Sequence, residues 1–411
     1  MITNIHIENF KSIQSLDLEL GRLNIFIGAN GSGKSNILEA IAMGSAAMED
    51  KLDDEFLVSR GVRVADPSLM SSRFNPQNKN LPVRVNFSNS NIKWGVEMYY
   101  AFRWKVRSGL LGSSNQDQLS ELNWLDEHLA QEELVEVFRK RYNIEISEDL
   151  EKNINLLNVL LKEDDAANAP IYPILKFQID QQILLKNGES DFINFLIYAP
   201  ENYFLRKFEE EGAIKPLGIR GEGIFKLFSD SAKNNPSQFK AITNTIEFLF
   251  DWCAGIEIPT DLKFTERRIK IKDQYLADDL QYFDQRSANE GFLYLLFYLT
   301  LFVSDLTPHF FAIDNIDNSL NPKLGSELIK VLAQLAKKHN KQALLTTHNP
   351  VILDGLDLED DDQRLFVVYR NADGHTKVRR VPPLKQVNGV SQVRLSEAFI
   401  RGYIGGLPDN F

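Results

Sequence analysis

Cysteine is almost absent from this sequence, since Cys253 is the only one among 411 residues. A single cysteine excludes an intrachain disulfide and fits a reducing compartment, so we expect a cytoplasmic protein. A long apolar segment is also missing, because the longest run, Phe292 to Val303, is shorter than the about 20 residues that cross a bilayer. We therefore expect a buried core helix there and no contact with a membrane.

Positive charge is in deficit as well, since 46 Lys and Arg face 57 Asp and Glu, and the net charge is −11. Any binding of nucleic acid must therefore come from a local basic patch. Two short clusters are candidates, Arg267 to Lys272 and Arg139 to Arg141, and a solvated surface is the competing explanation for both. No sustained heptad repeat follows residue 115, which argues against a long coiled-coil arm.

The sequence does contain a complete phosphate-binding motif, because GANGSGKS at residues 28–35 matches G-x-x-x-x-G-K-[ST] in full. Glycines let the backbone approach phosphate oxygens, a lysine places a positive charge at the β- and γ-phosphates, and a serine hydroxyl can bind Mg²⁺. Leu23 to Ile27 has the pattern of the buried strand before such a loop, and Lys34 to Ala46 that of the helix after it. The predicted ligands of ATP are Gly28, Ala29, Asn30, Gly31, Ser32, Gly33, Lys34, Ser35 and Asn36.

A carboxylate that would complete a Mg²⁺ site stands in the last third of the chain. Phe310 to Ile313 is an apolar stretch typical of a buried strand, and Asp314 follows it directly. Together with the phosphate-binding motif, this pattern predicts that Ser35 and Asp314 hold the metal. Capping of a helix N-terminus is the alternative role for such an aspartate.

Hydrophobic periodicity predicts an α/β arrangement at both ends of the chain. We expect strands at residues 2–7, 13–20, 343–346, 365–369 and 377–381, and helices at 289–303 and 324–338. In the middle we expect strands at 83–87, 96–106 and 262–271, and a helix at 237–252. Elements from the two ends are expected to share one sheet, with the middle as an inserted lobe.

Four motifs follow one another along the chain: IHIENFKSI, the phosphate-binding motif, AIDNIDNSLNP and LLTTHNP. In these motifs the sequence resembles the ABC-type ATPases of the RecF, SMC and OLD branch, over roughly residues 1–63 and 285–411. The resemblance implies an α/β fold, namely an ABC-type P-loop ATPase head with a mixed sheet and a large, partly helical inserted lobe. We accordingly expect a split head formed by 1–63 and 197–411, and an inserted mixed α/β lobe formed by 64–196. We expect no Toprim nuclease domain, as OLD members carry, after His348.

The resemblance also implies that two heads form a dimer around ATP. One head contributes its phosphate-binding loop, and the other contributes a signature segment, which here corresponds to RSANEGFLYLL. The residues expected near the γ-phosphate bound by the other head are Ser287, Asn289, Glu290 and Gly291. A plain helix N-cap is the competing role for this stretch.

Catalysis is expected from residues that follow the predicted strands at 310–313 and 343–346. The resemblance points to His348 as the residue that reaches the γ-phosphate or the attacking water. Where the family has a catalytic glutamate this chain has Asn315, and an amide cannot accept a proton. Either Asp317 acts as the base, or hydrolysis is slow and the protein works as a switch. The predicted catalytic residues are Asp314, Asn315, Asp317 and His348.

By the same resemblance we expect an ATPase of prokaryotic defence against phage that uses ATP and Mg²⁺. It would be a homo-oligomer, at least a dimer, that responds to a trigger such as DNA or a phage protein and serves a separate effector, for example a nuclease. Two other functions stay open: a RecF-like DNA repair or chromosome-maintenance ATPase, and a nucleotide-locked scaffold with little turnover.

Overall fold

The computed structural model describes residues 1–74, 81–89, 93–100, 104–110, 151–156, 190–207, 214–259, 268–277, 280, 282–383 and 393–407. The chain divides into two compact units, which are described separately below. The first consists of Met1–Glu19, Met43–Leu52 and Ala65–Asn194, and the second of Leu20–Ala42, Asp53–Val64 and Phe195–Phe411. One of the boundaries falls within helix α1 (Lys34–Met48), and each unit is built from segments that are distant in sequence.

The first unit contains a five-stranded sheet in the order β2-β1-β4-β5-β6, with every neighbouring pair antiparallel. One face is apolar, because Ile5, Ile7 and Val85 are buried and Phe87 stacks on Phe192 with ring centroids 3.6 Å apart. Apolar and polar residues alternate along β2, which leaves the polar side chains on the other face. The elements are β1 (Asn4–Phe10), β2 (Ile13–Glu19), β4 (Val83–Ser88), β5 (Lys93–Tyr100), β6 (Trp104–Leu110), α3 (Pro67–Met70) and α8 (Ser190–Ile193).

Strand β3 (Leu23–Ile27) lies inside a six-stranded sheet of the second unit, in the order β14-β13-β3-β12-β11-β7. It pairs in parallel with β12 on one edge and β13 on the other, so that Leu345 and Leu365 both stand opposite Ile25. The last strand, β14, runs antiparallel to β13, and the sheet is therefore mixed. Strands from the two ends of the chain share one sheet, as predicted. The other strands are β7 (Ile197–Tyr198), β11 (Phe310–Ile313), β12 (Gln342–Thr347), β13 (Gln363–Arg370) and β14 (Thr376–Val381).

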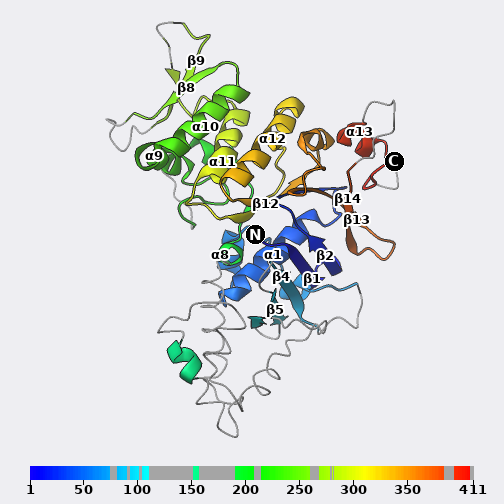
Figure 1. Ribbon diagram of the computed structural model, residues 1–411. Coiled ribbons are helices and arrows are strands. Elements are labelled where there is room, and N and C mark those ends of the chain that lie inside the picture. The colour runs from blue at the N-terminus through cyan, green and yellow to red at the C-terminus, as the bar shows by residue number, and fades with distance from the viewer. Residues whose placement is uncertain are drawn as a thin grey trace. The chain divides into compact units, whose positions relative to one another are not determined.

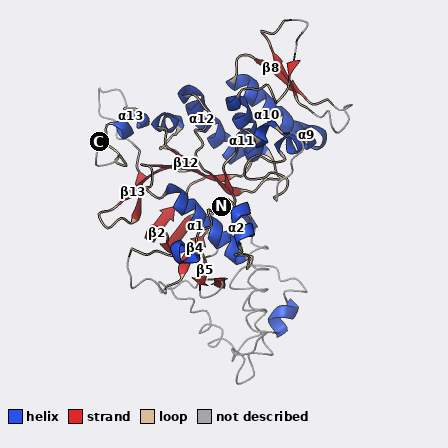
Figure 2. Ribbon diagram, turned by 180° about the vertical axis from the view of Figure 1, so that it is seen from behind, coloured by secondary structure: helices blue, strands red, loops and turns tan. Residues whose placement is uncertain are grey.

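Helices α11 (Glu290–Val303) and α12 (Pro322–Lys338) lie on one side of this sheet (Figures 1 and 2). All of α11 from Phe292 to Val303 is buried, and Ile25 of β3 and Ile313 of β11 belong to the same core. A helix that is apolar all round is typical of a protein interior, which confirms the core helix expected here. Among the residues that the structure describes, no helix combines the length and the apolar character needed to cross a membrane.

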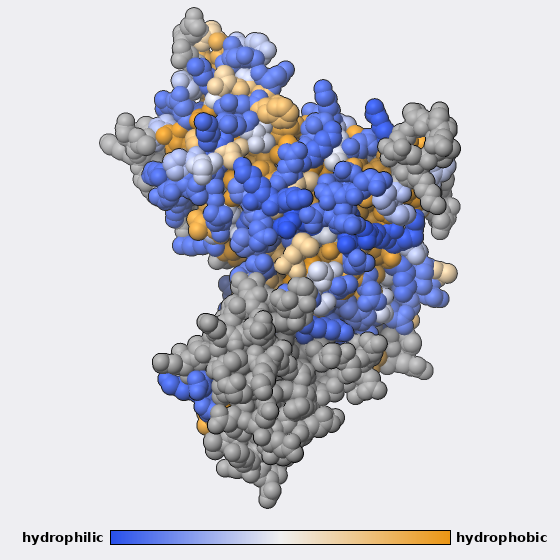
Figure 3. Space-filling view, in the orientation of Figure 1, coloured by the Kyte–Doolittle hydropathy of each residue, from blue (hydrophilic) through white to orange (hydrophobic). Residues whose placement is uncertain are grey.

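The remaining elements of the second unit surround that core. They are α2 (Asp54–Ser59), the 3₁₀ helix η3 (Phe204–Arg206), α9 (Ile224–Asn234), α10 (Pro236–Leu249), the 3₁₀ helix η5 (Pro350–Gly355) and α13 (Leu395–Ile400). A small antiparallel sheet of β8 (Cys253–Glu257), β9 (Lys270–Asp273) and β10 (Tyr282–Phe283) lies next to α10 (Figure 1). On the face seen in Figure 3, hydrophobic residues are scattered among hydrophilic ones.

Some elements of the middle differ from those expected. The stretch 96–106 was expected to be one strand, and this is wrong, because β5 ends at Tyr100 and β6 begins at Trp104 as its antiparallel partner. Aromatic residues flank the reversal, so composition gives no turn signal there. Only the last two residues of the strand expected at 262–271 are part of β9, and residues 260–267 lie outside the described residues, as do Arg139 to Arg141.

The division into units also differs from the expected one. Residues 1–19 and 43–52 group with 65–194, whereas we expected 1–63 to belong to the head and 64–196 to form the inserted lobe. The reason is the pairing of β1, which hydrogen-bonds to β4 as well as to β2 and places Ile5 opposite Phe87. The second unit nevertheless holds the phosphate-binding motif together with the C-terminal strands.

His6 on β1 gives the first unit a pH-dependent contribution to stability. Its Nε2 lies 3.0 Å from the carboxylate of Glu8, and its Nδ1 lies 2.7 Å from the carboxylate of Asp17. The two carboxylates, with Glu8 contributing most, raise the pKa of His6 to about 8. The protonated imidazole therefore stabilises the folded state. This contribution is fully present at a pH below about 6.5, the pKa of histidine in the unfolded chain, and it is lost as the pH rises through 8.

We expect the urea midpoint of the protein to fall between pH 6.5 and pH 9, and to fall less in the variant His6→Gln, which lacks the titrating group. The measurement is urea unfolding followed by circular dichroism across this pH range. Identical pH profiles for the two proteins would contradict the assignment.

Candidate nucleotide-binding site

The phosphate-binding loop connects a buried strand to a long helix. All five residues of β3 are buried, and six residues separate the end of β3 at Ile27 from the start of α1 at Lys34. Gly31 and Gly33 have φ values of 76° and 106°, in the left-handed region that residues with a β-carbon rarely adopt. The glycines of the motif are therefore required by the backbone path of the loop as well as by any phosphate that approaches it.

Lys34 is buried at the start of α1, and its side chain turns back over the loop. Its Nζ donates to the carbonyl oxygens of Gly28 at 2.8 Å and Ala29 at 3.1 Å. Burial lowers the pKa of Lys34 to about 8, despite the nearby carboxylates of Asp314 and Asp317. An ammonium group that is poorly solvated and close to backbone carbonyls would gain from a phosphate beside it.

Asp314 at the end of β11 is held by two hydroxyl groups. Thr346 Oγ1 donates to Oδ1 at 2.5 Å, and Ser35 Oγ donates to Oδ2 at 3.1 Å. Adjacent ligands of an octahedral Mg²⁺ ion, each about 2.1 Å from the metal, stand about 3.0 Å apart. The oxygens of Ser35 and Asp314 therefore fit two neighbouring positions of one Mg²⁺ ion.

No group of three or more His, Cys, Asp or Glu side chains that could hold a metal occurs in the described part of the chain. A small number of protein ligands suits Mg²⁺, which in proteins commonly takes its other ligands from phosphates and water.

His348 follows directly after β12 and its side chain is exposed. Its Nδ1 lies 3.4 Å from Nζ of Lys34. Partial burial first and the positive charge of Lys34 second lower the pKa of His348, which favours the neutral imidazole, and this form can accept a hydrogen bond. The structure thus brings together Lys34, Ser35, Asp314 and His348, which come from three different strand ends.

Asn315 and Asp317 occupy different surroundings after Asp314. The backbone of Asn315 has φ of 56°, in the left-handed region, and its N–H donates to Thr346 Oγ1 at 2.9 Å. Asparagine tolerates this conformation better than most residues with a β-carbon. Oδ1 of Asp317 accepts a hydrogen bond of 2.7 Å from Thr347, whose hydroxyl also accepts from the N–H of Asn349. Asp317 thus fastens the turn after β11 to the end of β12.

The predicted signature residues lie around the N-terminus of α11. Asn289 is the N-cap, and its side chain accepts from the N–H of Phe292 at 2.8 Å, which fulfils the capping role considered above. The Glu290 carboxylate accepts from Asn202 Nδ2 at 2.6 Å and from Ser319 Oγ at 2.9 Å. Ser287, Asn289 and Glu290 are exposed, so this end of α11 is accessible to another molecule.

A basic side chain from η3 holds the segment before α11. Nη1 of Arg206 donates to the carbonyl oxygens of Arg286 at 2.7 Å and Ala288 at 2.9 Å, and its Nε donates to Asn202 at 2.8 Å. Asn202 in turn bonds Glu290. This chain of hydrogen bonds fixes the signature segment against the turn that follows β11.

Several residues with clear contacts at the site were not singled out from the sequence. Thr346 and Thr347 orient Asp314 and Asp317. Two successive threonines just before His348, at the end of an apolar strand, could have indicated this role from the sequence. Arg63 pairs with the buried Glu39 of α1, Nε to Oε1 at 2.5 Å, and this pair has no recognisable spacing in the sequence.

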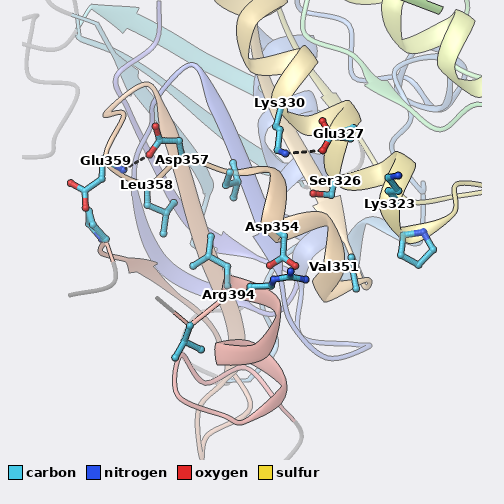
Figure 4. Close-up of a pocket in the computed structure, with 15 residues that line it drawn as sticks. Lys323, Ser326, Glu327, Lys330, Val351, Asp354, Asp357, Leu358, Glu359 and Arg394 are labelled. Atoms are coloured by element: carbon cyan, nitrogen blue, oxygen red, sulfur yellow. Dashed lines mark hydrogen bonds and ion pairs between the residues drawn. The ribbon is translucent and has the colours of Figure 1, made fainter. Parts of the chain in front are cut away.

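Two open cavities lie in the second unit. One, of about 400 Å³, borders Ala29 to Ser32 of the phosphate-binding loop, Val367 to Arg370 of β13 and Gly405 to Leu407 near the C-terminus. The other, of about 780 Å³, is formed by α12, η5 and the start of α13 (Figure 4). Asp354 in this second cavity accepts hydrogen bonds from the N–H and hydroxyl of Ser396, and it holds α13 in place.

Comparisons with known proteins agree with this geometry. Residues 23–354 match the family described as "AAA domain, putative AbiEii toxin, Type IV TA system". The chain is 40% identical over 98 residues to an uncharacterized protein of Methanocaldococcus jannaschii, an alignment that covers 22% of this chain and 44% of that protein. It is 51% identical over 41 residues to the DNA replication and repair protein RecF of Glaesserella parasuis serovar 5, which covers 10% and 11% of the two. The chain thus spans less than half the length of these relatives.

Among solved structures, the chain resembles an SMC head bound to the C-winged helix domain of ScpA, with a TM-score of 0.53 and 12% sequence identity. The alignment covers 93% of this chain and 98% of the SMC head. This likeness concerns the fold. It shows that the chain has the fold of an ABC-type P-loop ATPase head. The family match spans well over half of the sequence, and the chain belongs to the AAA-domain family named above.

The first prediction from the site concerns Lys34. The change Lys34→Ala removes the only side chain of the motif that brings a positive charge to a phosphate, and we expect at least a 100-fold loss of ATP affinity with unchanged circular dichroism. Isothermal titration calorimetry with Mg²⁺ and ATP measures the loss. Undiminished binding by the folded variant would refute the site.

The second prediction from the site concerns the general base for ATP hydrolysis. We expect slow steady-state hydrolysis of ATP, raised by Asn315→Glu by up to about 10²-fold, because a carboxylate can accept a proton from water. The left-handed backbone at residue 315 limits this gain, since glutamate is strained there by about 1 kcal/mol. Asp317→Asn is expected to change turnover little, because Asp317 is engaged by Thr347. The opposite pattern, with hydrolysis abolished in Asp317→Asn, would make Asp317 the base.

Proposed function

We propose that this protein binds ATP with Mg²⁺, hydrolyses it slowly, and uses the nucleotide state as a switch. The observation that carries the proposal is the cluster of Lys34, Ser35, Asp314 and His348 in one unit. Gly28 to Asn36 would hold the phosphates, and Ser35 with Asp314 would hold Mg²⁺. The amide of Asn315 can orient a water molecule but cannot take its proton, which supports slow turnover.

We further propose that two copies of the protein enclose ATP between them. In one copy the phosphate-binding loop is available, with Gly31 exposed. In the other, the exposed N-terminus of α11 offers Ser287 and the first N–H groups of a 14-residue helix, which favour an anion. Gly291 lies close to the turn after β11, because a β-carbon at this position would be only 3.2 Å from the carbonyl oxygen of Ser319. The signature segment would therefore move together with this turn.

For the biological role we propose an ATPase that serves a separate effector, such as a nuclease, in prokaryotic defence against phage, in the cytoplasm. The family description names a toxin and a TA system, and the SMC head in the solved structure is bound to a domain of another protein. The local identity with RecF favours a second candidate, a DNA repair or chromosome-maintenance ATPase. A scaffold with very little turnover is the third, and Asn315 favours it.

Assembly is tested by multi-angle light scattering. We expect the mass of the protein to rise from 47.0 kDa toward twice that value when ATP and Mg²⁺ are added. The variant Ser287→Arg should bind ATP but stay monomeric, because the substitution places a bulky side chain at the exposed signature segment. A protein whose mass does not respond to ATP, or a Ser287→Arg variant that still dimerises, would contradict the proposed dimer.

The three roles are separated by measuring ATP hydrolysis with and without duplex DNA. Stimulation by DNA of the isolated protein favours the repair role, and the absence of measurable turnover in either condition favours the scaffold. Slow turnover that is indifferent to DNA and changes when a candidate effector is added favours the defence role.

A further inference from the structure

The hairpin of β13 and β14 contacts the phosphate-binding loop with two side chains. Thr376 Oγ1 donates to the carbonyl oxygen of Ser32 at 2.8 Å, and Nε of Arg370 donates to the carbonyl oxygen of Gly31 at 2.8 Å. Arg370 and Thr376 are register partners on the two strands. One pair of facing residues therefore bonds two successive peptide groups of the loop.

These hydrogen bonds set the orientation of the amide groups that follow. In a trans peptide the C=O and the N–H point in opposite directions. When the carbonyl of Ser32 points toward Thr376, the N–H of Gly33 points away from the hairpin. Likewise, because the carbonyl of Gly31 points toward Arg370, the N–H of Ser32 points away from Arg370, and it donates to the carbonyl oxygen of Ala29 at 3.2 Å. The N–H groups of such a loop are the donors that bind phosphate.

The approach of the hairpin is as close as the backbone allows. A β-carbon at Gly33 would lie 2.1 Å from Thr376 Oγ1, and one at Gly28 would lie 2.0 Å from the carbonyl oxygen of Val368. Thr376 itself is fully buried, so its hydroxyl cannot turn to solvent. Two glycines of the motif thus make room for the hairpin, and the loop is held on the side that faces away from its N–H groups.

We propose that Thr376 and Arg370 are positioning residues for phosphate binding, and that the β13–β14 hairpin keeps the loop in its anion-binding conformation before the nucleotide arrives. This inference rests on the proposed binding of ATP. It adds that the affinity for phosphate depends on two side chains that lie outside the motif and act only through its backbone.

The test uses calorimetry with Mg²⁺ and two probes, ATP and inorganic tripolyphosphate. Thr376→Val keeps the shape but leaves the buried carbonyl of Ser32 without this donor, and we expect about tenfold weaker binding of both probes. Thr376→Ser retains a hydroxyl and should bind within about threefold of the unaltered protein. Arg370→Ala should weaken both probes as well, and because Arg370 is exposed this variant tests the proposal even if Thr376→Val does not fold.

Lys377→Ala is the matched control, since Lys377 is next to Thr376 on β14 and its side chain points to the opposite face of the strand. It should leave both affinities unchanged. Unaltered affinity in Thr376→Val and Arg370→Ala, a loss for ATP but not for tripolyphosphate, or an equal loss in Lys377→Ala would each overturn the inference. Failure of the unaltered protein to bind either probe would instead overturn the proposed function, and this inference with it.

Discussion

Strand β3 carries parallel neighbours on both edges, and this pairing places the phosphate-binding loop beside the residues that follow β12 and beside the β13–β14 hairpin. β12 on one side brings Thr346, Thr347 and His348 to the edge of the sheet where the phosphate-binding loop begins. β13 on the other side brings the hairpin to the back of the same loop. Carboxyl ends of parallel strands meet at one edge of a sheet, and loops at that edge can assemble a site from distant segments. Helix α11, which is buried from Phe292 to Val303, packs against the sheet and supports it.

Hydroxyl groups hold the acidic residues of this edge in place. Asp314 accepts from Ser35 and Thr346, and Asp317 accepts from Thr347, so both carboxylates are fixed by neighbours from other strands or loops. A second series of hydrogen bonds, from Arg206 through Asn202 to Glu290 and Ser319, runs from the signature segment to the turn after β11. The edge of the sheet that carries Asp314 and the exposed end of α11 are therefore joined by one turn, residues 315–320, and not only by the core.

The sequence alone was sufficient where the information is local. A strand, a glycine-rich loop and a helix start lie within a few residues of one another, and the structure contains the strand and the helix where they were predicted. The two strands β5 and β6 could not be separated, because their reversal between Tyr100 and Trp104 has aromatic residues on both sides. The contacts of Arg370 and Thr376 with the loop were also beyond reach, since they arise only when β13 pairs with β3. The helix cap at Asn289 was one of the roles that the sequence left open for this stretch, and the structure contains it.

The central place of β3 has a consequence for biosynthesis. Asn24 of β3 bonds Ala343, 319 positions later, so a ribosome completes most of the chain before either edge of β3 can find its partner. Contacts of such long separation form slowly, and until then the apolar strand is a site of misfolding or aggregation. An early-terminated or proteolysed chain that lacks β12 and β13 would retain the whole GANGSGKS motif yet have no sheet to support it. The order of synthesis would thus withhold the proposed nucleotide binding from incomplete chains.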